Sequence, residues 1–133
     1  MFLGIDYGTK NVGVAIGGPE TGLALPYITL QNDKNFFENL LKICADEKIE
    51  KIVIGIPMPT RGKIGEQVER ATKFAKAVGE KTKLPIETVD EKFTTREVES
   101  YFSDFKKEIK KISKDAAAAA IILQSYLELL TKK

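Results

Sequence analysis

The chain has 133 residues, of which 43% are hydrophobic and 30% are charged, and its formal net charge at neutral pH is +2. This length fits a single domain, residues 1–133, with a five-stranded sheet and covering helices. No apolar run approaches the roughly 20 residues that span a bilayer. The first residues enter a strand-like pattern without a basic leader, so we expect a cytoplasmic protein with no membrane contact.

Two residue types limit the chemistry that the chain can perform. It contains no histidine, which excludes His-based triads and nearly every arrangement of catalytic zinc. Its one cysteine, Cys44, excludes an internal disulfide, and the apolar pattern of residues 36–44 predicts that this thiol is buried on one face of a helix. Catalytic groups must therefore come from carboxylates, lysines, hydroxyls or the backbone.

The first part of the chain predicts three strands and a helix. The strands are expected at Phe2–Asp6, 12–16 and 24–30. Short turns rich in glycine separate them, which is typical of an antiparallel meander. Residues 35–47 then carry apolar side chains at helical spacing, with Asn32 or Asp33 available as the cap.

The rest of the chain alternates strands and helices. A continuous apolar strand at Lys51–Ile56 stops at Pro57, and the loop 57–65 leads to a helix that should end near Gly79. A strand at 85–91 and a helix opening at Thr94 follow. After the lysine-rich stretch 103–113, Asp115 should start a helix with an apolar face made of Ile121, Ile122, Tyr126, Leu129 and Leu130. We expect the five alanines 116–120 to let this last helix approach the sheet closely.

This order of elements predicts an α/β fold. Antiparallel hairpins come first and right-handed crossovers follow. The sheet should therefore be mixed and five-stranded, with three antiparallel strands, two further parallel strands joined by crossover helices, and helices on both faces.

Acidic residues at the ends of elements are the first candidates for a metal site, because Mg²⁺ and Mn²⁺ prefer carboxylate oxygens. Asp6 ends an otherwise apolar strand, Asp90 and Glu91 end the last strand, and Asp115 begins the last helix. Each also has an ordinary structural explanation, since a strand-end aspartate can cap a turn and an aspartate can cap a helix. Of two adjacent strand residues, only one can normally face a shared site.

Four sequence blocks together carry a specific resemblance. They are Gly4-Ile5-Asp6-Tyr7-Gly8-Thr9-Lys10-Asn11-Val12-Gly13-Val14-Ala15-Ile16, Gly55-Ile56-Pro57 with Gly62 and Gly65, Val89-Asp90-Glu91-Lys92-Phe93-Thr94-Thr95, and Lys114-Asp115 with the alanines and Ile121-Ile122-Leu123-Gln124-Ser125-Tyr126-Leu127. In this order, and over almost the whole chain, they resemble the signature blocks of the YqgF (RuvX-like) family.

The resemblance implies an RNase H-like nuclease fold in which Asp6, Glu91 and Asp115 fall on the acidic, metal-binding active-site positions. Family members are described as Holliday junction resolvases, by likeness to bacterial resolvases, and as nucleases that mature the 5′ end of pre-16S rRNA. Two positions depart from the family pattern. Lys92 stands where the family has arginine, which loses bidentate recognition of phosphate, and Lys114 stands where an apolar residue is common.

Cations near these blocks are candidates for binding nucleic acid. They are Lys10, Arg61, Lys63, Lys92 and Arg96, together with Lys107, Lys110 and Lys111 in the lysine-rich stretch. The alternative for that stretch is a solvated helix face whose apolar residues pack inward. If the lysines contact phosphates, affinity for nucleic acid should fall steeply with salt.

We therefore expect an Mg²⁺- or Mn²⁺-dependent nuclease in which Asp6, Glu91 and Asp115 ligate the metal and a monomer processes the 5′ end of pre-16S rRNA. One alternative is a resolvase of four-way DNA junctions, which needs a dimer to place two active sites. Another is a non-catalytic RNA-binding module for ribosome assembly. The block at Gly4 also resembles the phosphate loop of the actin and sugar-kinase superfamily, but those enzymes close two lobes around ATP and this chain supplies one.

Overall fold

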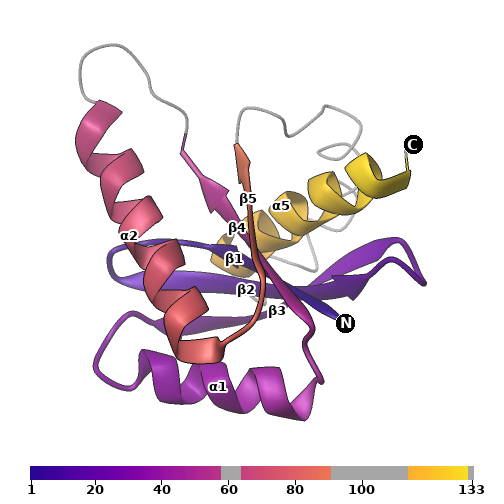
Figure 1. Ribbon diagram of the computed structural model, residues 1–133, viewed down its shortest axis with the longest axis horizontal. Helices are drawn as coiled ribbons and strands as arrows, with labels where there is room; N and C mark the ends of the chain where they lie inside the picture. Colours follow the sequence, from indigo (N-terminus) through magenta and orange to yellow (C-terminus); the bar gives the residue numbers. More distant parts are fainter. Residues whose placement is uncertain (58–63, 91–113, 132–133) are drawn as a thin grey trace.

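A computed structural model of the chain describes residues 1–57, 64–90 and 114–131, with five strands and three helices in these ranges (Figure 1). The elements are β1 (Phe2–Asp6), β2 (Asn11–Gly18), β3 (Leu23–Gln31), α1 (Phe36–Asp46), β4 (Lys51–Ile56), α2 (Ile64–Thr82), β5 (Ile86–Asp90) and α5 (Lys114–Thr131). The predicted helix from Thr94 and the stretch 103–113 lie outside the described residues. No helix in the described ranges is both long and apolar enough to cross a membrane.

The five strands form one mixed sheet in the order β3-β2-β1-β4-β5. The first three pair antiparallel, as expected of a meander, while β4 joins β1 and β5 joins β4 in parallel. α1 carries the chain from β3 at one edge across to β4, and α2 forms the crossover between the parallel neighbours β4 and β5. The predicted mixed five-stranded sheet is confirmed, and β1, which carries Asp6, lies at its centre.

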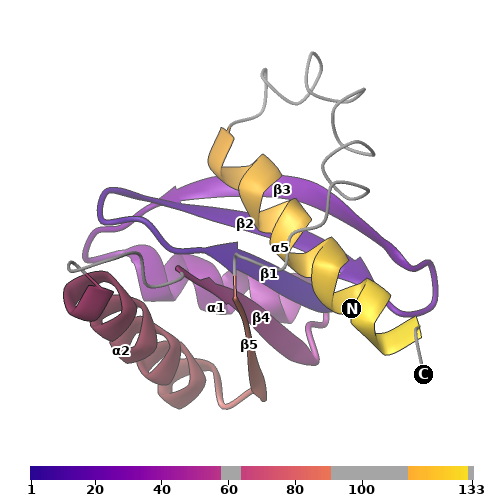
Figure 2. The same cartoon turned by 90° about the horizontal axis from the view of Figure 1, so that it is seen from above.

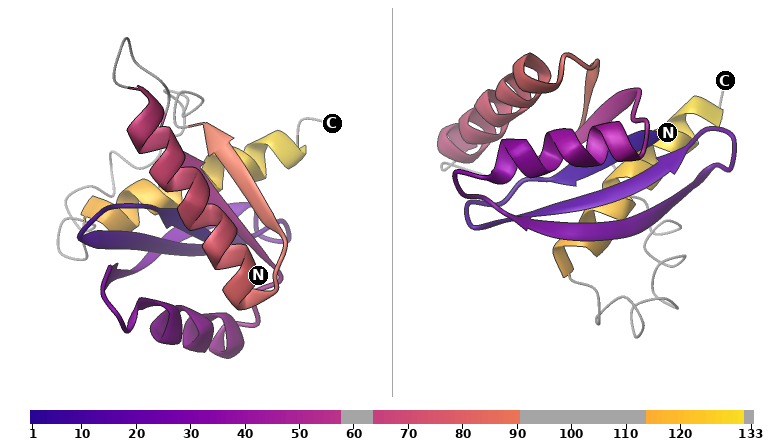
Figure 3. Two further views of the ribbon diagram at one scale, coloured as in Figure 1. Left: turned by 60° about the vertical axis from the view of Figure 1, so that its left-hand side comes forward. Right: turned by 90° about the horizontal axis from the view of Figure 1, so that it is seen from below.

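Helices cover both faces of the sheet. α1 and α2 pack on one face, and α5 is the one helix of the described ranges that crosses the other face (Figures 2 and 3). On the two-helix face, Phe36 and Leu40 of α1 and Phe74 and Val78 of α2 are buried against strand residues such as Ile5. Cys44 belongs to this core and is 9% exposed, which confirms the predicted buried thiol.

The α5 face is built on small residues. Ala116, Ala119 and Ala120 are fully buried, and a Cβ atom added to Gly4 of β1 would lie 2.7 Å from Leu123 Cβ and 2.8 Å from the Ala119 carbonyl oxygen. Real Cβ atoms do not come this close to their neighbours, so helix and sheet are in contact only because Gly4 has no side chain. The predicted close approach of the alanine segment is confirmed.

The predicted apolar face of α5 was partly wrong. Leu129 was expected to be buried but is 57% exposed, whereas Leu123 and Leu127 are buried. The helix turns its smallest residues toward the sheet, and this choice fixes which larger residues follow them on the same side one and two turns later. The buried stripe therefore runs from Ala116 through Ala119 and Leu123 to Leu127.

The end of α2 also differs from the prediction. We expected the helix to stop near Gly79, but it continues to Thr82. Lys83 then takes a left-handed conformation, with φ of 60°, and its N–H donates to the Gly79 carbonyl at 2.9 Å. Gly79 serves packing instead, because a Cβ there would lie 3.0 Å from Ile86 Cγ1 of β5.

Candidate active site

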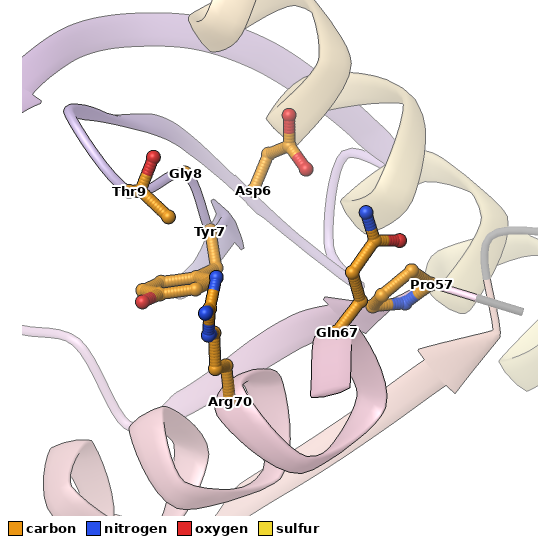
Figure 4. A pocket seen from close by; sticks show the side chains of 7 residues that line it. All are labelled: Asp6, Tyr7, Gly8, Thr9, Pro57, Gln67 and Arg70. Atoms are coloured by element: carbon orange, nitrogen blue, oxygen red, sulfur yellow. The ribbon is translucent and has the colours of Figure 1, made fainter. Parts of the chain in front are cut away.

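Asp6 is the last residue of β1, and both residues that pair with it in the sheet are glycines. It pairs with Gly13 of β2 on one side and with Gly55 of β4 on the other. Its side chain lies on the face of the sheet where Gly4 contacts α5, because residues two apart on a strand share a face. Figure 4 shows the carboxylate directed toward the ribbon of α5. Neither strand that pairs with β1 thus places a side chain directly beside this half-buried carboxylate.

Asp115 reaches the same place from the first turn of α5. A Cβ atom on Gly13 would overlap the carbonyl oxygen of Asp115, so the start of the helix rests directly on this glycine. Residues opposite each other in an antiparallel pair have Cβ positions about 5 Å apart on the same face. Gly13 is opposite Asp6. The start of α5 is therefore packed beside Asp6, although the two predicted acids lie near opposite ends of the sequence.

The α5 helix contributes charge as well as position. The first N–H groups of a helix have no partner within the helix and carry a partial positive charge. Here that end of α5 faces the level of the sheet at which Asp6 lies. Its field stabilises a carboxylate at this end of the sheet and attracts anions such as phosphate.

The acids at the end of β5 can be separated by the faces of the strand. Val89 is buried in the core beneath α5 and pairs with Gly55, which itself pairs with Asp6. Asp90, the next residue, therefore points to the opposite face of the sheet and is exposed. Asp90 does not share the face of Asp6. Glu91, the other predicted acid, lies outside the described residues.

Carboxylate oxygens suit Mg²⁺ or Mn²⁺, and one or two protein carboxylates are a common protein contribution to an Mg²⁺ site that also uses water and substrate phosphates. Asp6 and Asp115 are the described residues that could form such a pair at this end of the sheet. Within residues 1–57, 64–90 and 114–131, no three acidic, His or Cys side chains gather as a metal site. A third protein ligand would thus have to come from elsewhere, and Glu91 is the predicted one.

A pocket of about 320 Å³ opens beside Asp6 at the end of the sheet. Its lining comes from β1, the β1–β2 turn, the end of β4 and the start of α2, and consists of Asp6, Tyr7, Gly8, Thr9, Pro57, Gln67 and Arg70 (Figure 4). This volume lies in the usual range for ligand sites. Of these lining residues, Asp6 is the one that the sequence predicts to be functional.

Gln67 and Arg70 were missed because they sit in an ordinary amphipathic helix. The available signal was their spacing, since 67, 70, 74 and 78 fall on one face of α2 and continue the buried stripe of Phe74 and Val78 with polar residues. A polar extension of a buried stripe indicates a helix that projects past the sheet it covers.

One of the predicted nucleic-acid-binding residues, Lys10, lies in the part of the chain that the structure describes. Lys10 is exposed in the β1–β2 turn, two residues after Gly8 and outside the pocket lining. The other predicted cations lie outside the described residues. They are Arg61, Lys63, Lys92, Arg96, Lys107, Lys110 and Lys111.

Comparisons with solved structures identify the fold. The chain superposes on Thermus thermophilus RuvC, in a complex with a Holliday junction substrate, with a TM-score of 0.67 at 10% identity, covering 98% of this chain and 94% of that one. Fowlpox virus resolvase, in a complex with Holliday junction DNA, gives a TM-score of 0.56 at 13% identity, with 97% of each chain covered. The predicted RNase H-like fold is confirmed.

Comparisons of sequence identify close relatives. A protein of Sulfurihydrogenibium sp. is 37% identical over 131 residues, which cover 97% of this chain and 90% of the relative. A protein of Dictyoglomus turgidum is 35% identical over 133 residues, covering 97% and 94%. Both carry the name "Putative pre-16S rRNA nuclease". The family model RuvX, described as "Holliday junction resolvase", matches residues 1–129. On this match and these relatives, the chain belongs to the RuvX family of nucleases.

Proposed function

We propose that this protein is a metal-dependent endonuclease that hydrolyses phosphodiester bonds in the precursor of 16S rRNA, as a single cytoplasmic domain. The observation that supports the proposal is the contact of Gly13 with the backbone of Asp115 at the level of Asp6, which brings the first turn of α5 to the end of the central strand. The proposed substrate is taken from the names of the relatives in Sulfurihydrogenibium and Dictyoglomus, which refer to pre-16S rRNA.

The protein's own part in this reaction is to hold charge in fixed positions. When bound, Mg²⁺ or Mn²⁺ would activate water and neutralise charge on the phosphate. Asp6 is fixed by pairing of β1 on both sides, and Asp115 by the seat of α5 on Gly13. We assign Glu91 as the third acid, because Asp90 belongs to the other face of the sheet. No histidine is needed in such a site.

The substrate would be held by cations around the site. We assign this role to Lys10, and among the residues beyond the described ranges to Arg61, Lys63, Lys92, Arg96, Lys107, Lys110 and Lys111. Each phosphate contact should steepen the loss of affinity with increasing salt.

A second candidate function is cleavage of four-way DNA junctions, and the description of the RuvX family model favours it. A resolvase has to cut two strands symmetrically and therefore acts as a dimer. Trimming one RNA end needs one active site. We accordingly propose a monomer that acts on RNA, and oligomeric state separates the two candidates.

Both candidates can be tested in one cleavage experiment. Wild-type protein is incubated with a transcript carrying the 5′ end of the 16S precursor, or with a four-way junction, in Mg²⁺, Mn²⁺ or EDTA, and its mass is measured by light scattering. We expect a monomer that cleaves the transcript, with no cleavage in EDTA. Preference for the junction by a stable dimer would favour the second candidate. Binding of the transcript without cleavage in either metal would indicate an RNA-binding module.

Two variants of acidic residues test whether the assigned site carries out the cleavage. Removal of a metal ligand costs several kcal/mol of transition-state stabilisation, so Asp6→Asn should slow cleavage by about 100-fold or more. Asp90→Asn is the matched control, since Asp90 also ends a parallel strand but faces away from Asp6. It should keep most of the activity. Cleavage by Asp6→Asn at the wild-type rate would refute the assignment.

A further inference from the structure

The pocket beside Asp6 has a wall that the proposed metal chemistry does not use. Asp6 lies on one side of this pocket, and Gln67 and Arg70 of α2 extend toward it from the other side (Figure 4). The two walls differ in charge, since one carries a carboxylate and the other a guanidinium with an amide beside it. A ligand that fills the pocket must therefore suit both a cation-binding group and an anion-binding group.

The position of Arg70 follows from the packing of α2. Phe74, one turn further along the helix, stacks on Tyr7 with ring centroids 4.5 Å apart and on Phe36 with centroids 5.5 Å apart. Tyr7 directly follows Asp6 in the chain. The residue four positions before Phe74 lies on the same face of the helix, so Arg70 is carried to the rim beside Tyr7 and Asp6. The aromatic cluster thus fixes the place of Arg70 relative to the proposed metal site.

Arg70 is also available to a ligand. In α2, the ion pair joins Lys73 and Glu69, with Nζ and Oε1 3.5 Å apart. Arg70 forms no ion pair with any residue that the structure describes. The side chains of Arg70 and Gln67 are both exposed, and both line the pocket. Both offer hydrogen-bond donors in a plane, and the guanidinium fork matches two oxygens of one phosphate.

We propose that Arg70 and Gln67 bind a backbone phosphate of the substrate strand, next to the phosphate whose bond is broken at Asp6. The identity of the ligand as nucleic acid rests on the proposed function. In this arrangement the strand crosses the end of the sheet from the start of α5 to the start of α2, with one phosphate at the carboxylates and a neighbouring one in the pocket. Arg70 is then a positioning residue that sets where along the strand cleavage occurs.

Binding of a fluorescent single-stranded RNA tests this proposal without depending on cleavage. Anisotropy is measured in EDTA over a range of salt concentrations for wild type, Arg70→Ala, Arg70→Lys and Lys76→Ala. Lys76 is the matched control because it is an exposed cation on the same helix, about 9 Å further along the axis and outside the pocket. The unfolding temperature of each variant is recorded to confirm that it folds.

We expect Arg70→Ala to weaken binding about tenfold, as for loss of one charge-assisted phosphate contact, and to reduce the salt slope by about 1. Arg70→Lys should keep the salt slope but bind less tightly, because an ammonium lacks the fork. Lys76→Ala should match wild type. If Arg70→Ala and Lys76→Ala bind equally well, the proposal is wrong. A protein that never cleaves RNA but loses binding with Arg70→Ala would keep this phosphate site while the proposed nuclease activity fails.

Discussion

Cys44 lies on the inner side of α1, among the apolar side chains that cover one face of the sheet. Burial removes water from the thiol and raises the pKa of Cys44 above its ordinary value. The thiolate is the reactive form, so a raised pKa and a covered sulfur both slow reaction with electrophiles. This cysteine is a packing residue and has no place in the proposed chemistry.

The reactivity of Cys44 is accordingly a test of the two-helix core. In native buffer near pH 8, we expect its reaction with a thiol reagent such as DTNB to be slower than in urea by about tenfold or more, since burial both covers the sulfur and raises the pKa of the thiol. Absorbance of the released thiolate measures both rates. Equal rates in the folded and unfolded protein would mean that α1 does not cover the sulfur.

Single residues also show how far the sequence could lead to the site. Asp6 and Asp115 could be chosen from the sequence, because an acid at the end of an apolar strand and one before an alanine run are both unusual enough to notice. That the start of α5 packs beside Asp6 could not be derived from the sequence positions, since this packing depends on Gly13. A glycine within a strand suggests a bulge or a weak point, and only the packed structure shows that a helix rests on it.

At the level of elements, α5 is positioned by the absence of side chains. Gly13 lies beneath Asp115, Gly4 lies beneath Ala119 and Leu123, and the alanines of α5 complete the contact. A hydrogen-bonded anchor fixes the rotation of the helix, because Gln124 accepts from the Ala24 N–H at 2.8 Å and donates to the Gly22 carbonyl at 2.9 Å. The helix is therefore held close to the sheet at one end and tied to the β2–β3 hairpin further along.

Gly13→Ala should disturb this arrangement more than any other conservative change in β2. The added methyl overlaps the Asp115 carbonyl, so the start of α5 has to move away from Asp6, with an overpacking cost of about 1–3 kcal/mol. We expect a lower urea midpoint and, at temperatures where the protein stays folded, slower RNA cleavage. Urea unfolding and a cleavage assay measure the two effects.

The matched control for that substitution is Gly18→Ala in the same strand. A Cβ on Gly18 meets nothing nearer than Met1 at 3.8 Å, which is ordinary van der Waals contact. This variant should unfold and cleave like wild type. If Gly13→Ala behaves in the same way as Gly18→Ala, the contact with Gly13 does not position Asp115.

Elements were predictable from sequence to different degrees. The strands were found because alternating or continuous apolar residues end at glycines and prolines, and β4 has the predicted bounds, Lys51–Ile56. The inner face of α5 was only partly found, because large apolar residues on several sides of this helix conceal a stripe made of alanines. The end of α2 was misplaced because Gly79, which resembles a helix stop, serves contact with Ile86.

For the molecule as a whole, the site exists only when the chain is folded. β1 brings Asp6 to the centre of the sheet. α5, near the other end of the sequence, crosses the sheet so that its first turn, with Asp115, packs on Gly13 beside Asp6. The pocket adds α2 to the same edge, so three segments distant in sequence meet there. Two carboxylates that hold one metal act as a unit, and removal of either should disable the unit.

A shared metal site at Asp6 and Asp115 is therefore best tested by a double-mutant cycle on RNA cleavage with Asp6→Asn, Asp115→Asn and the combined variant. Residues that act as a unit have strongly non-additive effects on rate. We predict that each single variant loses about 100-fold or more in kcat/KM and that the combined variant loses little further. Two losses that multiply in the combined variant, or an Asp115→Asn protein as active as wild type, would contradict a shared metal site.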